Sequence, residues 1–191
     1  MDKGFWKNKY QDGSTGWDTG AITTPLKEYF DQLTDKSLRI LIPGAGNSHE
    51  AEYLFASGFT DVTVLDIAEE PLQNIALRLP YFPKNKLVCA DFFKHSGQYD
   101  IIIEQTFFCA LPPTMRDDYV KHMSTLLAPK GKLTGLMFCF PLTEKGPPFG
   151  GSKDEYLQRF SDLFKVDACE LAYNSIEPRR GNELWVSYSG K

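Results

Sequence analysis

Two glycines and an aspartate have the spacing of residues that bind a nucleoside. Residues 43–46 read Pro-Gly-Ala-Gly and follow the apolar run 38–42. Asp66 follows the apolar run 62–65 and lies 22 residues after Gly44. Glycines at a strand end allow a tight turn and bring backbone amides close to a ligand, and an acid after the second strand accepts ribose hydroxyls. The pattern predicts a nucleoside-bearing ligand; the alternative is an Asp66 that only caps a helix or faces solvent.

Position 49 separates two classes of cofactor. The dinucleotide motif Gly-x-Gly-x-x-Gly needs a third glycine there, and this chain has His49. That glycine permits close helix–strand contact under a pyrophosphate, so a histidine disfavours NAD and FAD. S-adenosylmethionine has no pyrophosphate and is therefore the expected cofactor. His49 itself either contacts the ligand or lies partly exposed.

Strand and helix patterns alternate along the whole chain. Apolar runs predict strands at 38–42, 62–65, 86–89, 99–103, 132–140, 164–172 and 183–189. Apolar positions at 3–4 spacing predict helices at 51–59, 69–79, 113–128 and 153–163, and Thr24 with Pro25 marks the start of another. The fold class predicted is α/β: a single doubly wound Rossmann-like domain over 1–191, with a seven-stranded, mostly parallel sheet and a C-terminal antiparallel hairpin. Residues 1–22 show no sustained period.

The composition excludes some classes of binding partner. The 191 residues carry 21 Lys+Arg against 25 Asp+Glu, a net charge of −4, so no nucleic-acid partner is expected. No apolar stretch approaches the roughly 20 residues that span a bilayer, so no membrane partner is expected. The four cysteines have no metal-ligand spacing, which predicts reduced thiols, a cytoplasmic location and no bound metal. The sequence leaves the oligomeric state open.

A series of short motifs in a fixed order carries a family resemblance. They are FW at 5–6, GWDTG at 16–20, TP at 24–25, LIPGAG at 41–46, FFCAL at 107–111, MR at 115–116, LLAPKG at 126–131, LM at 136–137 and GPPF at 146–149. Together they resemble the thiopurine methyltransferase family, and within it the branch of plant halide/thiol methyltransferases and their bacterial relatives. The resemblance implies an S-adenosylmethionine-dependent methyltransferase.

The resemblance also implies roles for individual residues. Residues 1–22 would form an aromatic lid over the cofactor, Asp91 and Phe92 would bracket the adenine, and Gln105 would lie near the sulfonium. The cofactor-binding residues implied are Trp6, Tyr10, Trp17, Gly44, Gly46, Asp66, Ile67, Asp91, Phe92 and Gln105. Tyr10 stands where the branch usually has Trp. Aromatic faces attract a sulfonium through cation–π interaction, which gives the lid residues a physical role beside that of a hydrophobic clasp.

The acceptor is expected to be a small, soft nucleophile, with a thiol favoured. Phe138 and Phe149 are the predicted acceptor-pocket residues, in an apolar wall with no obvious cation. Phe138 replaces a Tyr of the plant branch, which favours thiols over halides. A thiolate is itself the nucleophile, so no catalytic residue is assigned.

Several alternatives stay open from the sequence. A nicotinamide-dependent oxidoreductase is the enzyme alternative, and a domain that binds a cofactor or a protein without catalysis is the other. Glu104 either contacts ligand or is a solvated strand end. Arg179 and Arg180 are expected at a solvated hairpin tip; the alternative is that their loop overhangs the site. His95 and His122 are expected to be solvated, and the alternative is a catalytic role.

Overall fold

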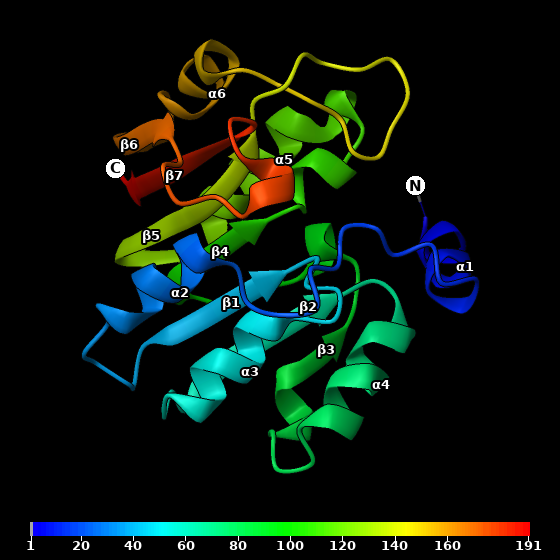
Figure 1. The fold of residues 1–191 in the computed structure, drawn as a ribbon. Coiled ribbons are helices and arrows are strands. Elements are labelled where there is room, and N and C mark those ends of the chain that lie inside the picture. Colours follow the sequence, from blue (N-terminus) through cyan, green and yellow to red (C-terminus); the bar gives the residue numbers. More distant parts are fainter. Residues whose placement is uncertain (1) are drawn as a thin grey trace. The chain divides into compact units, whose positions relative to one another are not determined.

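Three parallel strands form the sheet of the first part of the chain (Figure 1). The computed structural model describes residues 2–191 and consists of two compact units, with the boundary after His95. The first unit has the strand order β3-β2-β1. Its strands are β1 (Arg39–Pro43), β2 (Asp61–Asp66) and β3 (Leu87–Cys89). β1 and β2 are nearly continuous runs of buried apolar residues, which is typical of parallel strands covered on both faces.

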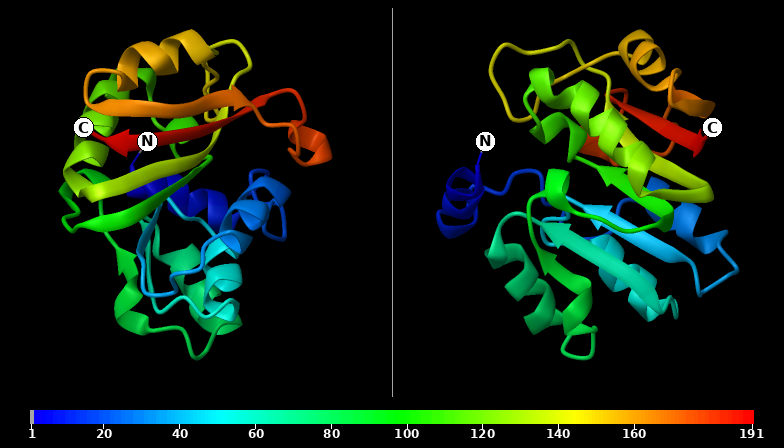
Figure 2. Two further views of the ribbon diagram at one scale, coloured as in Figure 1. Left: turned by 90° about the vertical axis from the view of Figure 1, so that its left-hand side faces the viewer. Right: turned by 180° about the vertical axis from the view of Figure 1, so that it is seen from behind.

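Helices cover this sheet and position the loops at its carboxyl edge. They are α1 (Lys3–Gln11), α2 (Thr24–Asp31), α3 (His49–Ala56) and α4 (Glu69–Arg78), with 3-10 turns η1 (Lys84–Lys86) and η2 (Phe92–Lys94). α3 and α4 pack on β2, and α1 packs on α4 (Figures 1 and 2). α3 ends before Gly58, whose φ of 87° suits a glycine after a helix end.

Two features at the N-terminus differ from the sequence-based predictions. α1 lies within residues 1–22, where no helical period is visible, because none of its residues is buried and it therefore has no apolar stripe. Asp2 caps it by accepting a hydrogen bond from Phe5 N at 2.9 Å. The N-cap of α2 is Thr23 and not Thr24, which leaves Pro25 in the first turn, where its missing N–H costs nothing.

The second unit has four strands in the order β4-β5-β7-β6. They are β4 (Tyr99–Gln105), β5 (Leu127–Phe138), β6 (Phe164–Leu171) and β7 (Glu183–Gly190). β4 and β5 are parallel, and β7 runs antiparallel to both β5 and β6, so the predicted antiparallel C-terminal pair is confirmed. The register between β5 and β7 places Phe138 opposite Glu183.

The core of the second unit is aromatic. Its helices are α5 (Arg116–Leu126) and α6 (Lys153–Phe160), with 3-10 turns η3 (Phe108–Ala110), η4 (Pro113–Met115) and η5 (Glu177–Arg179). Phe160 of α6 stacks on Tyr188 of β7 with ring centroids 4.3 Å apart. Tyr119 and Phe108 meet edge to face at 5.0 Å. α6 is held against β6 by this cluster.

The predicted fold class is confirmed, with shifts at element ends. The chain has seven strands, mostly parallel, alternating with helices until the final antiparallel pair. The helix predicted from residue 113 begins as the 3-10 turn η4. The strand predicted from residue 132 begins earlier, because Leu127 already pairs with Tyr99 of β4, before a shift in register. No helix within residues 2–191 has the length and apolarity needed to cross a membrane. The single-domain assignment over 1–191 stays a prediction, and Met1 lies outside the described residues.

Candidate functional site

The chain turns sharply after β1 through two glycines. Gly44 and Gly46 have φ values of 57° and 54°, in the left-handed region that favours glycine. Ala45 N, between them, donates to Leu65 O of β2 at 3.1 Å. A Cβ on Gly46 would lie 3.1 Å from the Tyr10 hydroxyl, so the close approach of that side chain also requires glycine. The predicted glycine turn therefore exists and is covered by the N-terminal segment.

Asp66 ends β2 as a buried carboxylate. Its Oδ2 accepts a hydrogen bond from Gly46 N at 2.9 Å, and its Oδ1 accepts one from Ala68 N at 2.8 Å. Burial raises the pKa of this carboxyl, against the lowering effect of those backbone bonds. The alternative of an Asp66 that faces solvent is wrong, since Asp66 is only 7% exposed and ties the glycine turn to the start of α4. Each oxygen still has a lone pair for a ligand hydroxyl.

The three predicted lid residues form one aromatic cluster. Trp6 meets Trp17 edge to face at 5.5 Å, and Tyr10 meets Trp17 in the same way at 5.7 Å. Burial, followed by the negative charge of Asp66, raises the pKa of Tyr10. Together with the approach of Tyr10 to Gly46, these contacts place the cluster beside the glycine turn.

Asp18 fastens the N-terminal segment to the loop before α3. It accepts hydrogen bonds from Asn47 Nδ2 at 2.5 Å and from Gly20 N at 2.8 Å, and it pairs with His49 Nε2 at 2.8 Å. Burial raises the pKa of Asp18, but the bonds from Asn47, Gly20 and His49 outweigh it and the net shift is downward. Asp18, Asn47 and His49 are called the N-terminal latch below. His49 is thus a partner of Asp18.

The residues expected at the adenine lie after β3. Asp91 Oδ1 accepts a hydrogen bond from Phe93 N at 3.0 Å, and Oδ2 is 4.0 Å from Lys94 Nζ. Phe92 is 5% exposed and meets Phe93 edge to face at 5.1 Å. Ile67, directly after β2, is half-buried. Asp91 keeps an exposed face through which its carboxylate can accept an amine.

Glu104, at the end of β4 in the second unit, is fully buried. Its Oε1 accepts hydrogen bonds from Phe107 N and Phe108 N, both at 2.9 Å, and its Oε2 accepts one from the Tyr119 hydroxyl. Burial raises the pKa of Glu104 to about 7 despite these donors. The alternative that Glu104 is a solvated residue at a strand end is therefore wrong. Gln105 follows it half-buried, and its role toward the cofactor stays a prediction.

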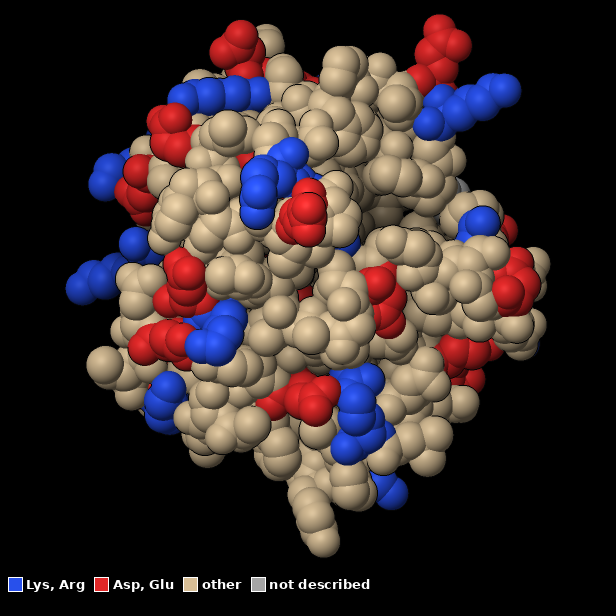
Figure 3. Space-filling model, in the orientation of Figure 1, with Lys and Arg blue, Asp and Glu red and all other residues tan. Residues whose placement is uncertain are grey.

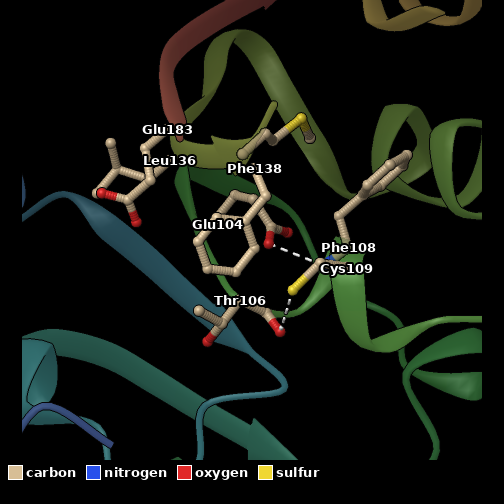
Figure 4. Close-up of a pocket in the computed structure, with 8 residues that line it drawn as sticks. Glu104, Thr106, Phe108, Cys109, Leu136, Phe138 and Glu183 are labelled. Atoms are coloured by element: carbon tan, nitrogen blue, oxygen red, sulfur yellow. Dashed lines mark hydrogen bonds between the residues drawn. The ribbon is translucent and has the colours of Figure 1, made fainter. Parts of the chain in front are cut away.

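A narrow pocket lies within the second unit. Eight residues line it: Glu104, Thr106, Phe108, Cys109, Leu136, Met137, Phe138 and Glu183 (Figure 4). Phe138 is thus a wall of this pocket, and its contact with the acceptor stays a prediction. Phe149 does not line it but lies against its rear, where its N–H donates to Cys109 O at 2.7 Å. Burial raises the pKa of the Cys109 thiol, so this cysteine is not an ionised nucleophile.

An ion pair that sequence reasoning missed stands beside this pocket. Arg179 Nη1 is 3.3 Å from Glu183 Oε1, and both residues are buried. The Arg179 guanidinium carbon lies 5.7 Å from the centre of the Phe138 ring. The expectations of a solvated tip at Arg179 and of a wall without a cation are therefore wrong. The one sequence signal is an arginine four residues before a glutamate that opens an apolar strand.

Arg116 holds the loop that follows β5. It is fully buried and donates from Nη1 to Glu155 Oε1 and from Nη2 to Gly150 O, each at 2.7 Å. Its guanidinium carbon is 4.6 Å from the centre of the Phe108 ring. The Tyr156 hydroxyl donates to the Phe138 carbonyl at 2.5 Å. These contacts fix Phe108 and Phe138, two walls of the pocket, from behind. Nothing in the MR motif alone predicts this role.

Comparison with known sequences gives one family. Residues 1–188 match the family model described as thiopurine S-methyltransferase. Thiocyanate methyltransferase 1 of Brassica oleracea is 32% identical over 96% of this chain and 83% of its own length. Probable thiol methyltransferase 2 of Arabidopsis thaliana is 29% identical over 94% and 82%.

Solved structures give the same fold. A Burkholderia thailandensis 1,6-didemethyltoxoflavin-N1-methyltransferase, crystallised with S-adenosylhomocysteine, has a TM-score of 0.81 at 18% identity and covers 99% of this chain and 87% of its own. The magnesium protoporphyrin IX methyltransferase of Synechocystis has a TM-score of 0.75 at 12% identity, with both chains fully covered. At these identities the likeness concerns the fold.

The seven-stranded fold thus agrees with that of the solved methyltransferases. The nicotinamide-dependent alternative is removed by the family match. Among residues 2–191 no group of three His, Cys, Asp or Glu side chains is placed to hold a metal ion. The chain belongs to the thiopurine S-methyltransferase family and is an S-adenosylmethionine-dependent methyltransferase.

Proposed function

We propose that this enzyme methylates the sulfur of a small thiol, which reacts as its thiolate. The observation that carries the proposal is the pocket of the second unit, where Phe108 and Phe138 form apolar walls and the Arg179 guanidinium lies over the Phe138 ring. Apolar walls suit a soft, weakly hydrated sulfur, and a nearby cation favours its anionic form. S-adenosylmethionine supplies an electrophilic methyl group on a good leaving group, so orientation and exclusion of water dominate the catalysis.

The first unit has the features that S-adenosylmethionine requires. A Cβ at Gly46 would crowd the Tyr10 hydroxyl, so a residue with a side chain does not fit at this position of the turn. We assign the ribose hydroxyls to Asp66, the methionine portion to Gly44 and Gly46, and the adenine to Asp91 with Phe92 and Ile67. Each of these assignments is a prediction of ligand contact by a residue that already has a fixed position.

The aromatic cluster has two tasks in this proposal. The faces of Trp6, Tyr10 and Trp17 attract the positive sulfonium through cation–π interaction, which weakens once the methyl group and its charge have left. The N-terminal latch holds the cluster beside the glycine turn. Residues 1–22 would then act as a lid that excludes water during transfer.

The names of two relatives support a sulfur acceptor. The Brassica protein is a thiocyanate methyltransferase and the Arabidopsis protein a probable thiol methyltransferase. Phe138 has no hydroxyl with which to donate a hydrogen bond to a small anion. We therefore expect thiols to be better acceptors than halides.

A competition assay tests the acceptor. The enzyme is incubated with S-adenosylmethionine, an alkanethiol, thiocyanate and iodide in one mixture, and the methylated products are separated by gas chromatography. We expect the methyl thioether to dominate. If methyl iodide dominates at equal acceptor concentrations, the Phe138 argument is wrong. If no S-adenosylhomocysteine forms with any sulfur acceptor, the thiol assignment fails.

The cellular setting is also part of the proposal. Four free cysteines are consistent with a reducing, cytoplasmic location. Acidic and basic side chains are interspersed on the face shown in Figure 3, which together with the net charge of −4 supports a small-molecule partner and not a nucleic acid. A cell-fractionation experiment checks the location, and a binding assay with duplex DNA and RNA at low salt checks the partner.

A further inference from the structure

We infer that Glu183 is the base that takes the proton of the acceptor thiol, an inference that rests on the proposed function. Glu183 lines the pocket from the first position of β7, directly opposite Phe138 of β5. The residue is 2% exposed. Its position on a regular strand gives the carboxylate a fixed place next to the wall that would hold the acceptor sulfur.

One oxygen of this carboxylate lacks a protein donor of normal geometry. Oε1 is engaged by Arg179 Nη1 at 3.3 Å, whereas Oε2 is buried and has no hydrogen bond of normal geometry from any described residue between 2 and 191. The Ser175 hydroxyl, which is also buried without a partner of normal geometry, is near enough to lower the pKa of this carboxyl. A buried carboxylate oxygen without a donor costs free energy, so such an oxygen in a pocket wall points to a ligand that brings a donor. A thiol S–H is such a donor.

The other ionisable groups around the pocket do not have this property. Neither oxygen of Glu104 lacks a donor, because they accept hydrogen bonds from Phe107 N, Phe108 N and the Tyr119 hydroxyl. Cys109 is a buried thiol that donates to Thr106 O at 3.3 Å. Glu183 is therefore the lining residue with a free acceptor atom.

The groups that face Glu183 adjust its basicity in opposite directions. Burial raises the pKa of Glu183, while Ser175 and Arg179 lower it; the net shift is upward. Cys139, which follows β5, is the remaining ionisable group near it, and burial, with a smaller effect from the charge of Glu183, raises the pKa of that thiol. A carboxylate with a raised pKa is a stronger base, and a thiol bound beside Arg179 is a stronger acid, so the proton transfer is favoured from both sides.

The proposed step balances in atoms and charge. The thiol S–H bond breaks and its proton goes to Glu183 Oε2. The sulfur electron pair forms a bond to the cofactor methyl carbon as the bond from that carbon to the sulfonium breaks, and the departing sulfur keeps the electron pair as a neutral thioether. Glu183 afterwards releases the proton to solvent. The acceptor class that needs this base is the un-ionised alkanethiols.

The test compares Glu183→Gln with the wild type on acceptors that differ only in whether they carry a proton. For an alkanethiol at neutral pH we expect kcat/KM to fall about 100-fold, within the range of general-base catalysis. For thiocyanate, which brings no proton, we expect a rate close to that of the wild type. An aromatic thiol, largely ionised at neutral pH, should lie between. The variant's rate with the alkanethiol should rise with pH as the thiolate fraction increases.

A second readout does not depend on turnover. With S-adenosylhomocysteine as the unreactive cofactor, the wild type should bind the alkanethiol as thiolate, seen as an increase in ultraviolet absorbance, and Glu183→Gln should not. Glu177→Gln is the matched control, since it makes the same substitution at an exposed glutamate of η5 that does not line the pocket, and its ratio of alkanethiol to thiocyanate rates should equal that of the wild type. Circular dichroism and calorimetry with S-adenosylhomocysteine establish that each variant is folded.

The possible failures are distinguishable. An equal loss in Glu183→Gln with alkanethiol and thiocyanate would make Glu183 a purely structural residue and overturn the inference, while thiol methylation by the wild type would still stand. A wild type that methylates no thiol would overturn the proposed function itself.

Discussion

Asp66 of the first unit and Glu183 of the second unit are buried carboxylates that are held in different ways. In the first unit, both oxygens of Asp66 accept hydrogen bonds from backbone N–H groups, of Gly46 and Ala68. In the second unit, Glu183 is held by the side chain of Arg179, and one of its oxygens accepts no hydrogen bond of normal geometry from the described residues. A carboxylate bonded by backbone is fixed in place. One held by a side chain can exchange its partner or its proton.

This difference fits two different tasks. A cofactor is the same molecule in every turnover, so the residues proposed to bind it gain from backbone positioning and lose little by being inflexible. An acceptor must arrive, lose a proton and leave methylated. The second unit accordingly builds its pocket from side chains that pair with one another, as Arg179 with Glu183 and Arg116 with Glu155.

The largest effect is expected from Asp66→Ala, which removes the backbone-held carboxylate. Affinity for S-adenosylhomocysteine should fall by about 1.5–3 kcal/mol, the usual value of hydrogen bonds to a charged group. Because Gly46 N and Ala68 N lose their acceptor inside the protein, the free energy of unfolding should also fall, by roughly 2–3 kcal/mol. Calorimetry and urea unfolding measure the two effects.

Asp91→Ala serves as the matched control for that experiment. Asp91 also accepts a backbone hydrogen bond, from Phe93, but its side chain is 39% exposed, so water can replace it. The free energy of unfolding should therefore fall less in Asp91→Ala than in Asp66→Ala. Equal stability changes in the two variants would contradict the description of Asp66 as a buried structural carboxylate.

Glu104 should make stability depend on pH. Its pKa is about 7 in the folded protein and 4.5 as an ordinary glutamate, so the folded state binds the proton more tightly. Stability from this group is therefore complete below about pH 4.5 and decreases as the pH rises to about 7, by a total of roughly 3 kcal/mol. Unfolding of wild type and Glu104→Gln at several pH values isolates this contribution. A difference between them that does not change between pH 4 and 8 would rule it out.

A smaller effect is expected from Gly46→Ala, which tests whether the turn after β1 requires a glycine. An alanine at a φ of 54° costs about 1–2 kcal/mol, and its Cβ would also press on the Tyr10 hydroxyl. Affinity for S-adenosylhomocysteine should fall by a similar amount. Gly13→Ala has a comparable φ of 73° with open space around it and controls for strain alone. If both variants bind equally well, the close approach of Tyr10 has no energetic consequence.

The smallest effect is expected at the N-terminal latch. His49→Ala removes one partner of Asp18 and should reduce stability by about 0.5–1 kcal/mol. Hydrogen exchange of residues 2–22 should become faster, and S-adenosylhomocysteine should slow it again if the segment is a lid. Lys7→Ala, on the exposed side of α1, should leave exchange unchanged. Exchange that is the same with and without the ligand would make the segment a permanent clasp.

The sequence predicts much of the first unit and less of the second, for physical reasons. Gly44, Gly46 and Asp66 have local backbone requirements, so their spacing reveals the turn and the acid. The apolar strand runs are equally legible, because burial on both faces leaves little room for polar residues. The same reasoning misses α1, since that helix has no buried face.

The pocket of the second unit is hidden from sequence reasoning because its contacts join distant elements. Nothing near Arg179 in the sequence shows that its guanidinium lies over Phe138, some 40 residues earlier in the chain. Glu104 reads as a strand-terminal acid, and only the folded chain brings Tyr119 and two backbone amides to it. Side-chain partners across elements are decided by tertiary packing, which periodicity does not encode.

The aromatic cluster also gives the protein its own optical reporter. Two of the three tryptophans, Trp6 and Trp17, meet edge to face beside Tyr10, and the third, Trp185, is on β7. Any movement of the N-terminal segment changes the surroundings of the first two, while Trp185 adds its own emission as a background. Intrinsic fluorescence in a stopped-flow instrument would therefore follow the segment during each turnover without a label, and Trp185→Phe would remove the background.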